Sequence, residues 1–200
     1  MKRITLALTG ASGMAYGLRL LECLLSTGCR VDLLLTQAAR IVAKQELDLA
    51  LPGEPAALTR LLSGQYPGGA LTVYGEKEWF APAASGSNPA DAMVVCPCSM
   101  GSLAAIAHGL ADTLIERAAD VMLKERRPLI LVPRETPFSL IHLRNMTQLA
   151  EAGAVILPAN PGFYHRPQNV EAVVDFIVAR VLDQLGIPQT LLARWGETGA

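Results

Sequence analysis

The stretch from Asp120 to Pro137 reads DVMLKERRPLILVPRETP, and it indicates how this chain folds. A short apolar run, Leu129 to Val132, lies between two prolines at its centre. Such an uninterrupted run is typical of a strand that is buried on both faces of a parallel sheet. Ligands of such sheets bind just beyond the carboxyl ends of the strands, which is where Arg134 and Glu135 follow. A cation beside an acid at that place indicates an anionic substrate and proton-linked chemistry.

Not every basic residue around this strand needs a ligand. A solvated charge cluster at a helix end explains Arg126 and Arg127, and the same alternative stays open for Arg134. The whole chain carries a formal net charge of −1, which argues against a general nucleic-acid binder.

Apolar runs of the same kind alternate with helical patterns along the rest of the chain. This alternation predicts an α/β fold with a mainly parallel sheet and helices on both faces. Right-handed crossovers then place all the strand-to-helix turns on one edge of the sheet. The expected strands are Ile4–Leu8, Val31–Leu35, Ala92–Cys96, Leu129–Val132 and Val155–Leu157. The expected helices are Met14–Ser26, Ala38–Gln45, a helix from Ser99, Leu114–Lys124, Leu140–Ala152 and Val170–Leu185.

The chain has 200 residues, of which 51% are hydrophobic, and this allows one large domain over residues 1–186 with a tail over 187–200. Leu51–Asn88 is rich in Pro, Gly and Ser, and we expect a long loop there, which is usually functional or a lid. The tail carries Trp195, for which docking on a neighbouring subunit and packing on its own domain are both open.

Targeting and redox signals are weak. The N-terminal apolar run stops at Thr9 and is too short for a signal peptide, and no run is long enough to span a membrane, so we expect a cytoplasmic protein. Free buried thiols are the favoured interpretation of the four cysteines, with a metal or redox site at Cys96-Pro97-Cys98 as the alternative. The three histidines lack the spacing of metal ligands, and we expect structural roles for them. They are His108, His142 and His165.

Two turns follow predicted strands and open predicted helices. In Thr9–Gly13 (TGASG), glycines let the backbone approach a ligand at a helix N-terminus. The spacing is not GxGxxG and the second strand ends in Thr36, not an acid, so a mononucleotide or phosphate fits better than NAD. A structural turn with Ser12 as helix cap is the alternative. In Cys96–Ser102, two serines can hold a phosphate or the edge of a flavin.

Two further residues stand out near the C-terminus. Tyr164, in PANPGFYHRP at 158–167, follows a predicted strand and therefore falls on the same edge. Arg180 lies inside an otherwise apolar helix, where it either meets an anionic ligand or extends to water.

These motifs together resemble the flavin prenyltransferase family, from about Lys2 to Trp195. The resemblance implies a Rossmann-like, flavodoxin-like three-layer sandwich, assembled as a homododecamer with flavin near subunit contacts. It implies that a dimethylallyl group passes from dimethylallyl phosphate to N5 and C6 of reduced FMN without a metal. The product, prenylated FMN, would serve a partner decarboxylase of ubiquinone biosynthesis or aromatic-acid breakdown. The motifs that carry the resemblance are TGASG, CPCSMGSLAAIA, ERAADVMLKERRPLILVPRETPFS, IHLRNM, GAVILPANPGFYHRP and VDFIVARVLDQLG.

The resemblance also implies roles for individual residues. The expected FMN contacts are Gly10, Ala11, Ser12, Thr36, Ser99, Met100, Gly101, Ser102 and Arg134. The expected prenyl-phosphate contacts are Lys124, Tyr164 and Arg180, which can neutralise the departing phosphate without a metal. The expected catalytic residues are Ser12, Glu46, Trp79 and Glu135, with Trp79 sheltering the allylic cation and the others, or the phosphate itself, moving protons.

Three other functions fit the sequence less well. A flavin-dependent cysteine decarboxylase of the same superfamily should carry its own active-site His and substrate clamp, which we do not find. A non-catalytic flavin carrier would not need the set formed by Lys124, Glu135, Tyr164 and Arg180. A nicotinamide oxidoreductase is disfavoured by the missing fingerprint.

Overall fold

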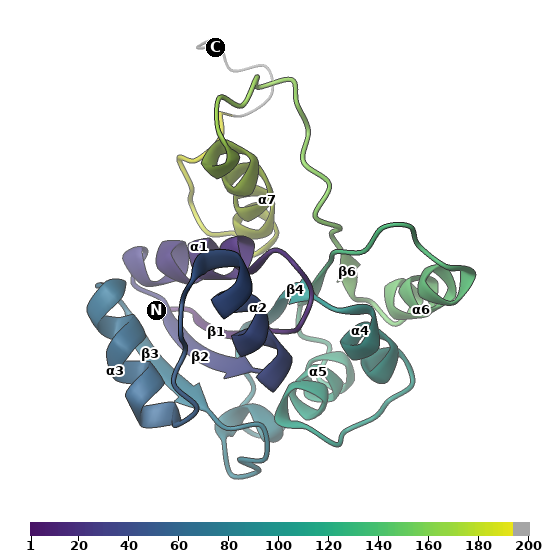
Figure 1. Ribbon diagram of the computed structural model, residues 1–200. Coiled ribbons are helices and arrows are strands. Elements are labelled where there is room, and N and C mark those ends of the chain that lie inside the picture. Colours follow the sequence, from purple (N-terminus) through teal and green to yellow (C-terminus); the bar gives the residue numbers. More distant parts are fainter. Residues whose placement is uncertain (194–200) are drawn as a thin grey trace.

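The computed structural model describes residues 1–193, which form a six-stranded sheet with every strand parallel to its neighbours (Figure 1). Strands β4 and β5 are buried along their whole length, as their uninterrupted apolar runs predict. The strands are β1 (Arg3–Leu8), β2 (Arg30–Leu35), β3 (Ala70–Tyr74), β4 (Ala92–Cys98), β5 (Leu129–Pro133) and β6 (Val155–Ile156).

The order of the strands creates the place for a ligand. In the sheet they lie in the order β3-β2-β1-β4-β5-β6, so β1 and β4 are neighbours although the chain leaves them in opposite directions. At such a switch point the turns after the two strands diverge and leave a crevice beyond their carboxyl ends. The turns that begin at Thr9 and Ser99 both lie there.

Helices cover both faces of the sheet and complete three layers (Figure 1). Helix α1 packs against α7, and together with α2 and α3 they enclose one apolar cluster. Helices α4, α5 and α6 enclose a second cluster on the opposite face. The predicted α/β fold is confirmed. The helices are α1 (Met14–Ser26), α2 (Gln37–Leu47), α3 (Pro55–Gln65), α4 (Met100–Ala107), α5 (Leu114–Lys124), α6 (Leu140–Glu151) and α7 (Val170–Gln184).

Helix α5 shows how local sequence sets an element's start. The Thr113 hydroxyl accepts a hydrogen bond from the Glu116 amide at 3.3 Å, and the Glu116 carboxylate accepts one from the Thr113 amide at 2.9 Å. This reciprocal capping box satisfies two amides that the first helical turn leaves without partners. The helix then buries an apolar face that includes Ala118, Val121 and Met122.

The expectation of a long loop over Leu51–Asn88 is wrong. The segment contains α3, the edge strand β3 and a short 3₁₀ helix, Pro82–Ala84. Proline stands at the first position of both helices, where its missing N–H costs nothing, so these prolines mark helix starts and not a loop. Glu54 caps α3 by accepting from the amides of Ala56 and Ala57 at 2.9 and 2.6 Å.

Two other expectations concern membranes and the tail. Across residues 1–193 the structure has no helix with the length and apolar character that crossing a bilayer requires. Trp195, with the proposed docking of the tail, lies outside the described residues.

Candidate functional site

The turns after β1 and β4 are joined by the side chain of Thr9. Its hydroxyl donates to the carbonyl of Pro97 at 2.8 Å and accepts from the amide of Ser99 at 2.8 Å. Thr9 is fully buried, so these bonds are shielded from water and fix the two turns relative to each other. The sequence signal for this role is a polar residue at the buried end of an apolar strand.

The second turn presents the N-terminus of α4 to the crevice. Ser99 caps the helix, because its hydroxyl accepts from the Ser102 amide at 3.2 Å and donates to the Ser102 hydroxyl at 3.0 Å. A Cβ atom added at Gly101 would meet no atom within 4 Å, so the space beside the first helical turn is open. Helix N-termini with free amides and hydroxyls favour anions such as phosphate.

The first turn is arranged differently, because a carboxylate already occupies the N-terminus of α1. Glu46, near the end of α2, accepts from the Gly13 amide at 3.0 and 3.1 Å and from the Met14 amide at 2.9 Å. Partial burial raises the pKa of Glu46, but the Ser12 hydroxyl, these two amides and the charge of Arg134 outweigh it and hold the pKa below its usual value. Glu46 is therefore ionised at neutral pH and beside Ser12.

Gly10 and Thr36 bring this turn against the start of α2. A Cβ at Gly10 would lie 2.5 Å from the Cβ of Ala38, so only glycine lets the turn pass this close. Thr36 begins α2, its hydroxyl accepting from the Ala39 amide at 3.0 Å. Both residues, with the buried Ala11, therefore lie at the carboxyl edge as the sequence predicts.

Arg134 ties the end of β5 to the same turn. Its Nε donates to the carbonyl of Ser12 at 3.1 Å. Burial raises the pKa of Tyr16, and the charge of Arg134 opposes part of that rise. Glu135 is half-buried beside it, and its carboxylate accepts from the Thr136 amide at 3.0 Å. Three strand ends thus converge, and the residues of the predicted flavin site meet there.

Trp79 lies beyond the end of β3, also at the carboxyl edge but toward the far side of the sheet. Its side chain is 44% exposed, and the Lys77 ammonium lies 5.7 Å from the ring centroid. Glu76 anchors this segment by accepting from the Gln37 amide at 3.0 Å. The Trp79 ring is therefore available to a partner or ligand from outside.

Lys124 lies at the amino edge of the sheet, where the strands begin, and thus opposite the turns described above. It is the last residue of α5, which descends from the carboxyl edge, and it pairs with Glu125 beside Gly86. The strand that separates it from Arg134, Leu129–Pro133, spans roughly 16 Å. A single chain therefore does not bring Lys124 to the flavin turns.

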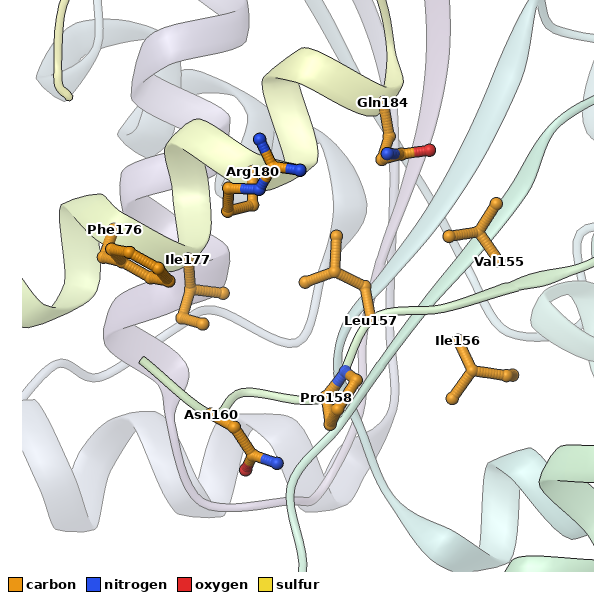
Figure 2. A pocket seen from close by; sticks show the side chains of 9 residues that line it. All are labelled: Val155, Ile156, Leu157, Pro158, Asn160, Phe176, Ile177, Arg180 and Gln184. Atoms are coloured by element: carbon orange, nitrogen blue, oxygen red, sulfur yellow. The ribbon is translucent and has the colours of Figure 1, made fainter. Parts of the chain in front are cut away.

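Tyr164 and Arg180 belong to a third part of the molecule. Tyr164 is exposed in the segment that follows β6. Arg180 lies on α7, near β6 (Figure 2). Arg180 lines a pocket of about 310 Å³ together with Phe176 and Leu157, and its guanidinium donates to Asp183 at 2.7 Å. Helix α7 ends at the amino edge of the sheet, where the Lys2 ammonium donates to the carbonyl of Leu185 at 2.5 Å. Arg180 lies only about 7 Å along the helix from that end.

The cysteines pack in the interior as thiols. All four are free and buried, as we expected. Burial raises the pKa of Cys98 to about 12 and that of Cys23 to about 11, mainly by penalising the charged form. Within residues 1–193, no group of three or more His, Cys, Asp or Glu side chains lies close enough together to hold a metal ion.

Known flavoproteins are similar to this chain over nearly its whole length. The Flavoprotein family matches residues 1–182. The protein named flavin prenyltransferase UbiX of Pseudomonas aeruginosa is 59% identical over 199 residues, covering 98% of this chain and 95% of that protein. The protein of the same name from Escherichia coli K12 is 46% identical over 198 residues, which cover 98% of each chain.

Solved structures of related proteins are also similar to this chain. The structure of AnUbiX (PadA1) in complex with FMN and dimethylallyl pyrophosphate has a TM-score of 0.88 and 41% identity, with 99% of both chains covered. A dodecameric FMN-dependent UbiX-like decarboxylase from Escherichia coli O157:H7 has a TM-score of 0.86 and 36% identity, covering 96% of this chain and 98% of that one. The chain belongs to the Flavoprotein family and, within it, to the flavin prenyltransferases.

Proposed function

We propose that this protein joins the dimethylallyl group of dimethylallyl phosphate to N5 and C6 of reduced FMN, making prenylated FMN. The observation that carries this proposal is the identity of 59% over nearly the whole chain to a flavin prenyltransferase. The turns after β1, β4 and β5 support it, because they lie together at the carboxyl edge of the sheet. Glu46 lies beside Ser12 there, and Glu135 follows Arg134.

The residues at the carboxyl edge fit FMN. The N-terminus of α4, with the hydroxyls of Ser99 and Ser102 and open space beside Gly101, suits the flavin phosphate. The N-terminus of α1 does not suit it, because Glu46 already engages those amides. We therefore assign the β1 turn to the flavin ring and the β4 turn to its phosphate tail.

Reduced FMN would supply two electron-rich atoms: N5 would take the allylic carbon as the phosphate leaves, and C6 would bond to the far end of the chain once its double bond has gained a proton. Lys124, Arg180 and the Tyr164 hydroxyl neutralise the phosphate as it departs, so no metal is needed for that charge. Trp79 shelters positive charge on the allylic carbon with its π face. Bond formation at C6 releases a proton, and Glu135, Glu46 with Ser12, or the departing phosphate accepts it.

A single copy does not assemble this set, so we infer that copies of the chain complete it for one another. Lys124 is roughly a strand's length from Arg134, on the other edge of the sheet. Large apolar side chains are exposed at Phe80, Phe163, Leu140 and Ile141, which is typical of surfaces that meet a partner. The similar structure from Escherichia coli O157:H7 is dodecameric, and we propose a homododecamer here as well.

The product and the place of action extend the proposal. Prenylated FMN made here would pass to a decarboxylase that uses it, in ubiquinone biosynthesis or aromatic-acid breakdown, and we propose that this occurs in the cytoplasm. No feature of the described residues favours a non-catalytic carrier or a cysteine decarboxylase over the prenyltransferase.

The test is an anaerobic incubation of the purified oligomer with reduced FMN and dimethylallyl phosphate, followed by mass spectrometry of the flavin. We expect a flavin heavier by one dimethylallyl unit, formed equally well with EDTA, and a parallel incubation with the pyrophosphate measures the donor preference. Unmodified flavin would contradict the proposal. Activity that is lost with EDTA and restored by magnesium would contradict the metal-free mechanism.

A further inference from the structure

The segment after β6, residues 157–169, has neither helix nor strand but is held to α7 by aromatic rings. Gly162 is packed between two of them: a Cβ there would lie 2.9 Å from the Tyr164 ring and 3.0 Å from the Phe176 ring. Any other residue at 162 would displace one ring or the other. The contact therefore sets how closely the segment approaches α7.

His165 makes the second contact of this kind. Its imidazole stacks on Phe176 with 5.2 Å between ring centroids and 16° between ring planes. Neither ring nitrogen has a hydrogen-bond partner among the described residues, although both nitrogens are buried. Unpaired buried nitrogens carry a desolvation penalty, so hydrogen bonding does not hold the ring here. The stack on Phe176 therefore holds the imidazole ring in place.

Phe176 connects this stack to the proposed phosphate site. It lies four residues before Arg180 on α7, so the two side chains are neighbours on one face of the helix. Both line the pocket between β6 and α7 (Figure 2). Tyr164 directly precedes His165, and the position of the His165 ring therefore limits where Tyr164 can lie relative to Arg180.

We propose that His165 is a positioning residue for the prenyl-phosphate donor, acting through its stack on Phe176 to hold Tyr164 beside Arg180. The inference rests on the proposed function, in which Tyr164 and Arg180 contact the phosphate. It assigns the role to the flat face of the ring and not to its nitrogens. A phenylalanine at this position should therefore serve as well as histidine.

The experiment compares His165→Ala with His165→Phe in the intact oligomer. Calorimetry measures the Kd of dimethylallyl phosphate with oxidised FMN bound, and turnover with reduced FMN gives KM and kcat. We expect His165→Ala to raise Kd and KM about tenfold, the scale of one lost aromatic stack, with kcat and FMN affinity near those of the parent. His165→Phe should restore the parent values.

A double-mutant cycle that combines His165→Ala with Phe176→Leu tests whether His165 acts through Phe176. If His165 acts through Phe176, the combination of His165→Ala and Phe176→Leu should weaken donor binding no more than the worse single change. Additive losses would overturn the proposal, as would parent-like donor binding in His165→Ala or failure of His165→Phe to restore it. A parent that binds the donor but leaves flavin unmodified overturns the proposed function alone, because the Kd comparison still decides the role of His165.

Discussion

At the residue scale, Arg134 and Glu135 are neighbours with different attachments. Arg134 reaches back to the carbonyl of Ser12, whereas the Glu135 carboxylate accepts from the adjacent Thr136 amide. We predict that Glu135→Gln binds FMN with near-parent affinity but forms prenylated FMN at least about a hundredfold more slowly, because it cannot accept a proton. Single-turnover mass spectrometry measures the rate.

The matched control is the residue before it. Arg134→Ala removes a cation from the turn that we assign to the flavin, so it should weaken FMN binding itself, measured by flavin titration. If Glu135→Gln turned over like the parent while binding FMN normally, Glu135 would be a structural residue and its catalytic assignment would be wrong.

Glu46 provides a prediction about pH. Because its pKa is lowered in the folded protein, its contribution to stability is present above the usual Glu pKa of about 4.3 and is lost as pH falls through the folded-state pKa. We therefore expect Glu46→Gln to be less stable than the parent at pH 7, with the difference narrowing below about pH 4. Chemical denaturation across this range measures it, and a gap that stays constant would show that the charge of Glu46 is not what stabilises the α1 N-terminus.

At the element scale, α6 begins with a reciprocal cap that the sequence did not reveal. The Ser139 hydroxyl accepts from the His142 amide at 3.2 Å, and His142 Nδ1 accepts from the Ser139 amide at 3.2 Å. We predict that His142→Ala lowers the free energy of unfolding by about 1 kcal/mol, since it removes one of two capping bonds. His142→Gln can rebuild the box and should lose less. Equal losses in equilibrium denaturation would show that the cap contributes little.

The elements themselves were largely predictable from the sequence. Helices α1 and α5 begin and end where the apolar spacing indicates, because one face of each contacts the sheet. Helix α3 and strand β3 were missed, because Pro55 reads as a loop residue unless its place in the first helical turn is known. An edge strand such as β3 also buries less of its surface than β4 and gives a weaker apolar signal.

At the scale of the whole molecule, the convergence of the residues proposed to bind flavin was predictable, and the separation of those proposed to bind the prenyl phosphate was not. Parallel strands bring Ser12, Ser99 and Arg134 to one edge by topology alone. The contact of Glu46 with the start of α1 depends on how α2 crosses that edge, which local pattern does not contain. The separation of Lys124 from Arg134 appears only when the chain is followed around the sheet.

Lys124 and Arg180 lie on helices α5 and α7, which cover opposite faces of the sheet, and this leads to a prediction about the assembly. If Lys124 and Arg180 contact one phosphate from different copies, Lys124→Ala and Arg180→Ala oligomers should each be nearly inactive, because each lacks a charge on every phosphate site. Dissociated, mixed and reassembled together, they should recover about a quarter of the parent activity, since half the copies supply each intact residue. Separately reassembled variants are the control. A mixture that stays as inactive as its components, although light scattering shows mixed oligomers of parent size, would place both residues of each site on one chain.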